Sequence, residues 1–295
     1  MASSGSPKLQ TSDTALLTNI LQEAVFTQQE KSIAGSLFTV YDMTSIPGLT
    51  AQIPVYPSIT AEEPGQTVDL TDTSVTLSTV TIAAAEIGSR VDVSDLLAES
   101  TARNMGSDVG QLLGSAIGEK IDVDAFGVFT EANITTNVVG SSSGEITPET
   151  LLQAVYKLRN VNAPTDISGD YFCVLHPGQA YNIAKVLTQA GYAASVAPHV
   201  SDVGNSLLSS SAYVGRLFNV KIFQSTAIAA DSANGAFGAV FSPMAIAHVL
   251  KRPLRLETQR DASKRSTEYV ATTARGNGIL KESYACLVRG DRIIN

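Results

Sequence analysis

The chain has 295 residues, 44% of them hydrophobic, and its formal net charge is −8. This length and hydrophobic content predict one or two folded domains and exclude a disordered chain. An acidic chain also argues against a dedicated DNA-binding protein, because the affinity of such proteins depends on neutralising phosphates. The charge is nevertheless uneven, since residues 251–295 hold 10 Lys and Arg against 5 Asp and Glu. Such asymmetry is typical of nucleic-acid binding or of contact between unlike ends of neighbouring subunits.

The first residues are polar and no long uncharged apolar run follows, so we expect no signal peptide and no membrane span. The expected place of synthesis is therefore the cytoplasm. Cys173 and Cys286 both lie in apolar, strand-like runs, which favours buried free thiols over a disulfide or a zinc site.

A helix is predicted over residues 14–29, with Ser12 or Asp13 as its N-cap and Gly35 after its end. From its position and size we interpret it as an arm rather than a core element. Prolines then divide residues 38–56 into short pieces that are typical of edge strands and turns.

A long two-stranded hairpin is predicted over residues 57–85, where a turn at residues 62–66 is followed by apolar residues alternating with Ser and Thr. The segment is rich in hydroxyls and poor in large apolar side chains. Such a hairpin cannot bury a core of its own, so we expect it to lie on something else. Ser94 and Asp95 then start a short helix.

The central element is a long amphipathic helix predicted over residues 104–130, whose apolar residues recur at three- and four-residue steps. Four glycines fall on one of its faces: Gly106, Gly110, Gly114 and Gly118. Each costs about 1 kcal/mol against alanine in a helix interior, so we expect a sheet or another copy of the chain to pack closely there. Charged residues interrupt the run, which argues against a membrane helix.

Strands and helices alternate in the next part of the chain. Thr147 is the predicted N-cap of a helix over residues 148–160, and a strand at residues 171–176 and a helix at residues 177–187 follow. After an Ala- and Ser-rich loop, one strand is expected around residues 214–223. This order predicts a compact α/β domain.

Four more strands are predicted near the C-terminus, with one short helical piece near Met244, and we expect them to return to the long helix. They cover residues 237–250, 255–261, 267–275 and 279–289. The overall fold class is therefore α+β.

Motifs that could carry chemistry lack their structural context. Residues 140–144 match the G-x-S-x-G pattern, but a charged residue and a proline turn follow them instead of the helix that a nucleophile elbow requires, so a loop is favoured over a nucleophile. Three histidines, His176, His199 and His248, have no Cys, Asp or Glu partner at metal-ligand spacing, which favours structural roles.

Two further patterns have simple structural interpretations. Asp122 and Asp124 lack the glycine and the distal glutamate of a calcium loop, and we interpret them as part of a solvated helix face. Gly276 and Gly278 lack the third glycine of a dinucleotide fingerprint and predict a turn. The sequence therefore predicts no catalytic residue, no cofactor and no metal site.

The order of these elements resembles that of the HK97-like major capsid proteins of tailed bacteriophages, over essentially the whole chain. Residues 90–97 (RVDVSDLL) are similar to the family's I-x-V-S-x-L-L entry to the long helix, and residues 172–179 (FCVLHPGQ) to its strand-then-helix opening. Residues 215–222 (GRLFNVKI) look like its G-x-L-x-G-x-P-V strand, with departures at Asn219 and Lys221.

The resemblance implies a division into named parts. These are an N-terminal arm at residues 1–52, a hairpin called the E-loop at 53–85, a peripheral domain at 86–136 and 237–295 with the long helix as its spine, and an axial α/β domain at 137–236. The implied function is a structural, non-enzymatic subunit of an icosahedral capsid, which self-assembles into hexamers and pentamers around double-stranded DNA in the virion.

The implied partners are other copies of the chain and a portal protein, with room for decoration proteins and for a scaffold. Only about a dozen residues precede the first predicted helix, so we expect the scaffold to be a separate protein or absent. Packaged DNA is contacted non-specifically, and no membrane is involved. Two alternatives remain. An encapsulin-type compartment shares the fold and differs in enclosing protein cargo instead of DNA. An α/β enzyme built on the central residues would differ in size under native conditions, because it would be a monomer or a small oligomer.

The uneven charge gains a role in such an assembly, because an acidic hairpin can meet the basic C-terminal strands of a neighbour. We expect this contact to involve Glu62, Glu63, Asp69 and Asp72 on the hairpin, and Arg255, Arg260, Lys264 and Arg265 on the strands. Some relatives join subunits by an isopeptide bond between an E-loop lysine and an asparagine. No lysine lies between Lys31 and Arg90, so this bond is predicted to be absent, although Asn277 could sit in a suitable loop.

Overall fold

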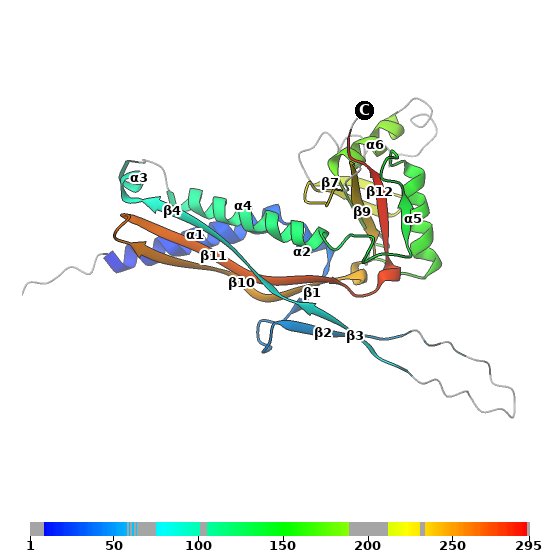
Figure 1. The fold of residues 1–295 in the computed structure, drawn as a ribbon, viewed down its shortest axis with the longest axis horizontal. Coiled ribbons are helices and arrows are strands. Elements are labelled where there is room, and N and C mark those ends of the chain that lie inside the picture. Colours follow the sequence, from blue (N-terminus) through cyan, green and yellow to red (C-terminus); the bar gives the residue numbers. More distant parts are fainter. Residues whose placement is uncertain are drawn as a thin grey trace, which may run out of the picture.

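The computed structural model describes residues 9–57, 59, 61, 63, 75–100, 105–188, 212–230 and 234–293. These residues form an elongated part on a four-stranded sheet and a compact part on a six-stranded sheet, and a two-stranded hairpin projects from the elongated part (Figure 1). The mixture of helices and separate sheets agrees with the predicted α+β class.

The four-stranded sheet has the strand order β1-β10-β11-β4. Its long central hairpin consists of β10 (Ile246–Asp261) and β11 (Ser266–Ile279). At one edge β4 (Ala85–Ser94) pairs antiparallel with β11, and at the other β1 (Thr39–Asp42) pairs parallel with β10.

Strand β10 is continuous where the sequence predicted two strands. Its pairing with β11 shifts register between Leu250 and Arg252 and again between Arg252 and Arg255, a span that contains Pro253. A proline cannot donate to the ladder, so the strand accommodates it as a bulge instead of ending there.

Two long helices lie side by side over one face of this sheet: α1 (Leu9–Lys31) and α4 (Met105–Phe126) (Figure 1). The short helix α2 (Ala34–Leu37) follows α1, and α3 (Asp95–Ser100) follows β4, where the sequence predicted a short helix. The long helix predicted over residues 104–130 is therefore confirmed, with an end four residues earlier.

The interpretation of the first helix as an arm outside the core is wrong. Helix α1 begins at Leu9, so the expected caps at residues 12 and 13 lie inside it. Its Ile20 and Ala24 are fully buried in one cluster with residues of α4 and of the sheet. The physical reason is that Gly110, Gly114 and Gly118 give α4 a flat face, on which α1 of the same chain packs.

The six-stranded sheet has the order β5-β12-β9-β6-β8-β7. Its strands are β5 (Val138–Gly140), β6 (Tyr171–Leu175), β7 (Tyr213–Leu217), β8 (Val220–Gln224), β9 (Gly235–Phe241) and β12 (Ala285–Asp291). Helices α5 (Pro148–Asn160) and α6 (Pro177–Thr188) pack on one of its faces. Both helices and β6 are confirmed predictions, and the Thr147 hydroxyl accepts a hydrogen bond from the Thr150 N–H as the predicted N-cap.

Two expectations about this sheet are wrong. The strand expected around residues 214–223 is a hairpin of β7 and β8, because Phe218 and Asn219 both have positive φ, +53° and +61°, and reverse the chain. Strands β9 and β12, expected to return to the long helix, instead pair with each other and extend this sheet. Most of the Ala- and Ser-rich loop, residues 189–211, lies outside the described residues.

The projecting hairpin consists of β2 (Thr50–Val55) and β3 (Ser78–Ala83). A hairpin in this region is confirmed, but its first strand begins before residue 57, and most of the predicted turn at residues 62–66 lies outside the described residues. Gly276 and Gly278 lie within β11, so the predicted turn there is wrong. A Cβ on Gly276 would overlap the Ala83 carbonyl oxygen, and one on Gly278 would lie 2.7 Å from Ile82 Cγ1, so these glycines let β3 cross β11 closely.

Two short 3-10 helices, η1 (Pro243–Ala245) and η2 (Glu282–Tyr284), mark where the chain passes between the two sheets. Four phenylalanines from different segments pack together at this junction: Phe38, Phe126, Phe129 and Phe241. All four are buried in one cluster with residues of the six-stranded sheet, so the end of α4 fastens the two parts to each other.

Candidate inter-subunit surfaces

The glycine face of α4 lies against α1 of the same chain, not against a sheet or another copy as expected. A Cβ on Gly110 would lie 2.8 Å from the Ile20 carbonyl oxygen, and one on Gly118 would lie 3.2 Å from Lys31 Cβ. Gly114 is tighter still, and Gly106 is buried in the first turn of α4. This face is therefore not free for contact with another subunit.

Asp122 is a structural residue that the sequence interpretation placed wrongly on a solvated face. Its side chain is 4% exposed, and its carboxylate accepts hydrogen bonds from Ser32 Oγ at 2.8 Å and from the backbone N–H groups of Ile33 and Ala34, both at 3.1 Å. Burial raises the pKa of this carboxyl group. A signal did exist, because Asp122 follows Gly118 by four residues and continues the buried glycine row. The sequence did not show that α1 packs against this row.

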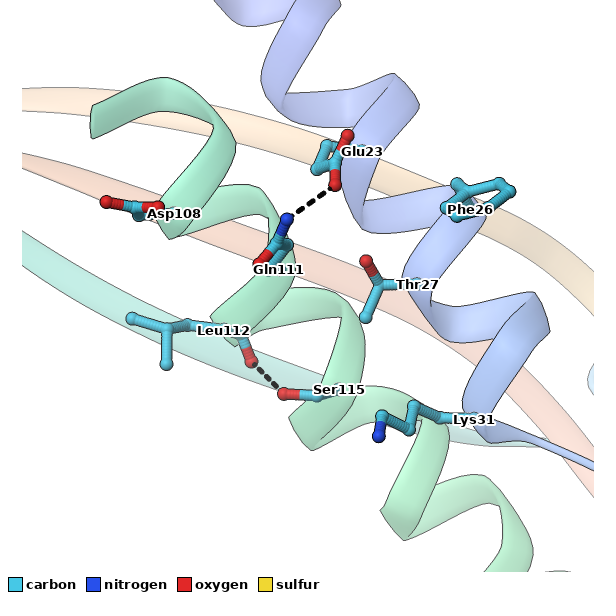
Figure 2. Close-up of a pocket in the computed structure, with 8 residues that line it drawn as sticks. All are labelled: Glu23, Phe26, Thr27, Lys31, Asp108, Gln111, Leu112 and Ser115. Atoms are coloured by element: carbon cyan, nitrogen blue, oxygen red, sulfur yellow. Dashed lines mark hydrogen bonds between the residues drawn. The ribbon is translucent and has the colours of Figure 1, made fainter. Parts of the chain in front are cut away.

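A shallow groove runs between α1 and α4 on the side away from the sheet (Figure 2). It exposes Phe26 and Leu112, and a hydrogen bond of 2.8 Å from Gln111 Nε2 to Glu23 Oε1 joins the two helices across it. Its remaining lining residues are Thr27, Lys31, Asp108 and Ser115. This mixture of isolated charges and apolar side chains suits contact with another surface and assembles no reactive group.

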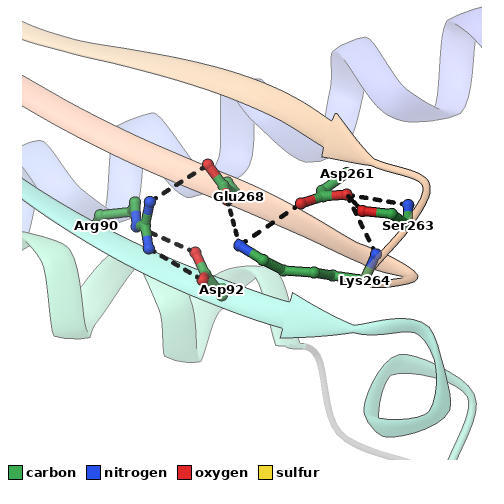
Figure 3. A network of polar contacts seen from close by, with 6 residues as sticks. All are labelled: Arg90, Asp92, Asp261, Ser263, Lys264 and Glu268. Atoms are coloured by element: carbon green, nitrogen blue, oxygen red, sulfur yellow. Dashed lines mark hydrogen bonds and ion pairs between the residues drawn. The ribbon is translucent and has the colours of Figure 1, made fainter.

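Three of the four basic residues predicted to meet a neighbour's hairpin, Arg255, Arg260 and Lys264, form ion pairs with acidic residues of their own chain. At the tip of the β10–β11 hairpin, Lys264 Nζ lies 3.5 Å from Asp261 and 3.8 Å from Glu268 (Figure 3). In the same network Glu268 also lies 3.6 Å from Arg90, which lies 3.3 Å from Asp92. The Asp261 side chain at this tip is also held by Ser263, whose hydroxyl donates a hydrogen bond to the Asp261 carboxylate. This hydrogen bond lowers the pKa of Asp261 to about 2.

The other predicted contact residues are placed as follows. Arg260 donates two hydrogen bonds to the Asp95 carboxylate, at 2.7 and 2.6 Å, and these lower the pKa of Asp95. Arg255 pairs with Glu257, and Arg265 is exposed. On the hairpin Glu63 is exposed, whereas Glu62, Asp69 and Asp72 lie outside the described residues.

Among its described residues, the hairpin is anchored at its root. Ile53 and Ile82 are buried there against Ala247 and Val249 of β10. Beyond the root, four large apolar side chains are exposed: Tyr56, Ile59, Val75 and Leu77. Exposed apolar side chains concentrated on one projecting element mark a surface that another molecule covers.

The residues that resembled chemical motifs have structural surroundings. Gly140 ends β5 with φ +81°, and the next helix begins only at Pro148, so the G-x-S-x-G segment lacks the strand–helix turn of a nucleophile. Ser142 of this segment accepts a hydrogen bond from Arg289. Within the described ranges, no three His, Cys, Asp or Glu residues are grouped as a metal site requires, and no helix is long and apolar enough to cross a membrane.

The histidines and cysteines also fit structural roles. His248 is buried, its Nδ1 lies 2.6 Å from the Asn277 Oδ1, and burial lowers its pKa. Asn277 therefore lies in a strand and contacts His248, not in the loop suggested for it. His176 Nδ1 accepts from a backbone N–H two residues on, and His199 lies outside the described residues. Cys173 and Cys286 are free and buried, as predicted, and burial raises the pKa of Cys286 to about 12.

A long helix on a four-stranded sheet, a second sheet of six strands and a projecting hairpin together define a class of shell-building proteins. A family model described as phage capsid protein matches residues 55–289, and the chain belongs to this family. It is a major capsid protein that forms the shell of a phage capsid, so its role is structural rather than enzymatic.

Solved structures agree with this assignment. The chain is similar to the capsid of Ralstonia phage GP4, with a TM-score of 0.66, 12% identity and coverage of 88% of this chain and 91% of that one. For the capsid of a native GTA particle, the TM-score is 0.65 and the identity 12%, with coverage of 88% of this chain and 90% of that one. For the capsid of the cyanophage P-SCSP1u, the TM-score is 0.63 and the identity 17%, with coverage of 88% of each chain. At these identities the likeness shows the fold, that of HK97-like phage capsids. A search of curated protein sequences gave no significant match.

Proposed function

We propose that this capsid subunit assembles into hexamers and pentamers of an icosahedral shell that encloses double-stranded DNA. The observation that carries the proposal is the hairpin β2–β3, which leaves the body of the molecule with its root buried and its outer apolar residues exposed (Figure 1). A neighbouring copy in a closed ring would cover these residues. In this arrangement the hairpin is the E-loop.

The other named parts follow with changed bounds. The elongated part is the peripheral domain, and it includes α1, because Ile20 and Ala24 belong to its core. The compact part is the axial domain, and it includes β9 and β12, because they extend its sheet. The arm proper is then limited to residues outside α1.

Contacts between neighbours are non-covalent in this proposal. The hairpin region offers no lysine for an isopeptide bond, and Asn277 is engaged with His248. Charge contacts between the acidic hairpin and the basic strands require Arg255, Arg260 and Lys264 to exchange partners. Exposed ion pairs contribute only about 0–1 kcal/mol each, so such an exchange costs little.

Further partners fit the same shell. A portal protein at one vertex and separate scaffold or decoration proteins would contact surfaces that the subunits leave free. Packaged DNA would be contacted weakly and through its phosphates, because acidic partners balance several basic residues of the sheet. The groove between α1 and α4 is one surface open to such accessory proteins.

Electron microscopy of the expressed chain tests the proposal, alone and together with its genomic neighbours. The informative variant replaces residues 56–77 by a two-residue Asn-Gly turn, which joins β2 to β3 and leaves the buried root intact. We expect folded subunits that form no shells, whereas the full chain forms them. Equal assembly with and without the hairpin would contradict the proposal. Nuclease-protected DNA inside the particles supports a capsid, and enclosed protein cargo supports the encapsulin-type alternative.

A further inference from the structure

A pocket of about 350 Å³ opens between the end of α1, the short helix α2 and the four-stranded sheet. The sheet contributes His248 and Leu250 of β10 and Arg275 of β11, and α1 contributes Gln28. Of the described residues that line this pocket, none is acidic, and Arg275 is the only one with a permanent charge. We call it the Arg275 pocket.

The alternation of side chains along β11 turns Arg275 toward the helices. Ala271 is buried in the cluster that the sheet shares with α1 and α4, and Thr273 is also fully buried. Arg275 follows at the same spacing of two residues, so it lies on the same face of the sheet. Helix α1 ends at Lys31, three residues after Gln28. The pocket therefore lies where the helix stops covering the sheet.

Two neutral acceptors hold the Arg275 side chain in place. Its Nε donates to Thr273 Oγ1 and its Nη1 to His248 Nε2, both at 3.3 Å. The Nε2 of His248 is therefore the unprotonated ring nitrogen, and Nδ1 donates to Asn277 Oδ1 at 2.6 Å. Burial favours this neutral histidine, because it lowers the pKa of His248. The pocket therefore presents a single positive charge.

No carboxylate of the described residues compensates this charge. Burial lowers the pKa of Arg275, and no neighbouring carboxylate raises it. Asp122 contacts the pocket residue Ser32, but its oxygens accept hydrogen bonds from the Ser32 hydroxyl and from the N–H groups of Ile33 and Ala34. A partly buried charge without an opposite charge is costly, because nothing offsets its desolvation.

Donor groups in the pocket are left without acceptors. The Nη2 group of Arg275 has no hydrogen-bond partner among the described residues, since the two bonds of the guanidinium use Nε and Nη1. Gln28 is only 5% exposed, and its side-chain amide makes no hydrogen bond to a described residue either. Buried amides are nearly always hydrogen-bonded. An acceptor placed in the pocket would satisfy both groups.

We propose that the Arg275 pocket binds a small oxyanion, a phosphate or a carboxylate, between the guanidinium of Arg275 and the side-chain amide of Gln28. The planar guanidinium fits two oxygens of either group. The bound anion links the end of α1 to the sheet and stabilises the folded subunit. A DNA backbone fits less well, because DNA binding depends on several cations and the pocket holds one. The site does not depend on how the subunits assemble.

Calorimetric titration of the full-length chain with inorganic phosphate tests the site, with sodium chloride at equal ionic strength as the blank. We expect Arg275→Gln to weaken phosphate binding by roughly tenfold or more, because charge-assisted hydrogen bonds are lost. Arg90→Gln is the matched control. It removes the same charge from an exposed position on the same sheet, where Arg90 pairs with Asp92 and Glu268, and should bind phosphate as the unchanged chain does. Titration with acetate shows which of the two oxyanions is preferred.

A second variant supplies the anion from within the chain, and it keeps the test decisive if Arg275→Gln does not fold. The new carboxylate of Gln28→Glu should pair with Arg275. We therefore expect this variant to unfold at a higher temperature than the unchanged chain in chloride, and to bind phosphate at least roughly tenfold more weakly. Gln22→Glu adds the same charge at an exposed position of α1 outside the pocket and should keep phosphate binding.

Loss of phosphate binding in Arg275→Gln and Gln28→Glu, but not in Arg90→Gln and Gln22→Glu, would support the site. Absence of binding by both phosphate and acetate would overturn it, and so would equal binding by Arg275→Gln and the unchanged chain. An equal response to chloride would indicate a general effect of salt and would also overturn it. Binding of a double-stranded oligonucleotide that depends on Arg275, without binding of either small anion, would assign the pocket to DNA instead.

Discussion

Replacing Gly114 by alanine tests the packing of α1 on α4 most directly. A Cβ at this position would overlap the Ala24 carbonyl oxygen and lie 3.0 Å from both Ala24 Cα and Thr27 Cβ. Alanine gains about 1 kcal/mol of helix propensity over glycine, whereas overpacking typically costs about 1–3 kcal/mol. The obstructing atoms at Ala24 belong to the backbone and cannot move without α1, so the cost lies near the upper end of that range. We expect a net loss of about 2 kcal/mol.

Denaturant unfolding of dissociated subunits measures this loss, and two control variants define its meaning. Gly35→Ala in α2 places a Cβ where no atom lies within 4 Å, so it should be neutral or stabilise by up to about 1 kcal/mol. Glu119→Gln on the exposed face of α4 should change the free energy of unfolding by less than about 0.5 kcal/mol. Gly114→Leu should block folding or assembly altogether. If Gly114→Ala is as stable as the unchanged chain, α1 does not lie on the glycine face of the free subunit.

Three further predictions concern other parts of the molecule. Asp122→Ala leaves the buried N–H of Ala34, the partly buried N–H of Ile33 and the Ser32 hydroxyl without their acceptor. It should cost about 1.5–3 kcal/mol in unfolding experiments, more than Asp122→Asn, and equal losses would show that the hydrogen bonds contribute little. In dissociated subunits, hydrogen exchange should be slow in residues 17–31 and fast in the hairpin beyond residue 55, and fast exchange in both would mean that α1 is released. Mature particles should dissolve into single 30.9 kDa bands and lose stability as salt rises; a covalent ladder after boiling would contradict non-covalent assembly, and shells indifferent to salt would contradict a contribution of charge contacts.

Elements with strong local signals could be predicted from the sequence. Thr147 and Pro148 fixed the start of α5, because a capping hydroxyl and an N-terminal proline act within a single turn. The step of four residues between glycines likewise located α4 and its flat face. These signals depend only on near neighbours in the chain, which a sequence displays directly.

Long-range pairing could not be predicted in the same way. Nothing near β9 and β12 indicates that they pair with each other and with the six-stranded sheet, because their apolar runs suit any buried strand. The positive φ of Phe218 was also unpredictable, since a phenylalanine rarely takes a left-handed conformation. For the candidate contact surface, the sequence supplied the charges of Arg260 and Lys264 but not their partners in the same chain.

Glu282 joins the two parts of the molecule and makes the stability of their junction depend on pH. It lies in η2 between the two sheets, and one of its carboxylate oxygens accepts four hydrogen bonds of 2.6–3.1 Å from the N–H and hydroxyl groups of Thr135 and Thr136. These hydrogen bonds lower the pKa of Glu282 to about 2, from an ordinary value of 4.5. Between these two values the unfolded chain binds more protons than the folded one, so stability rises with pH. The contribution is complete above pH 4.5 and is lost as the pH falls toward 2.

Glu282→Gln removes the titrating group while keeping an oxygen acceptor, so the variant should lose part of the rise in stability between pH 2 and 4.5. Urea unfolding across this window measures the rise, and Glu119→Gln on the exposed face of α4 serves as the control that should keep it. Because Glu282 is close to solvent, its hydrogen bonds are partly screened and the change should be modest. The comparison therefore concerns the slope with pH and not the absolute stability. Parallel curves for Glu282→Gln and the unchanged chain would mean that the four hydrogen bonds are not formed in solution, and that the aromatic cluster at Phe126 alone fastens the two parts.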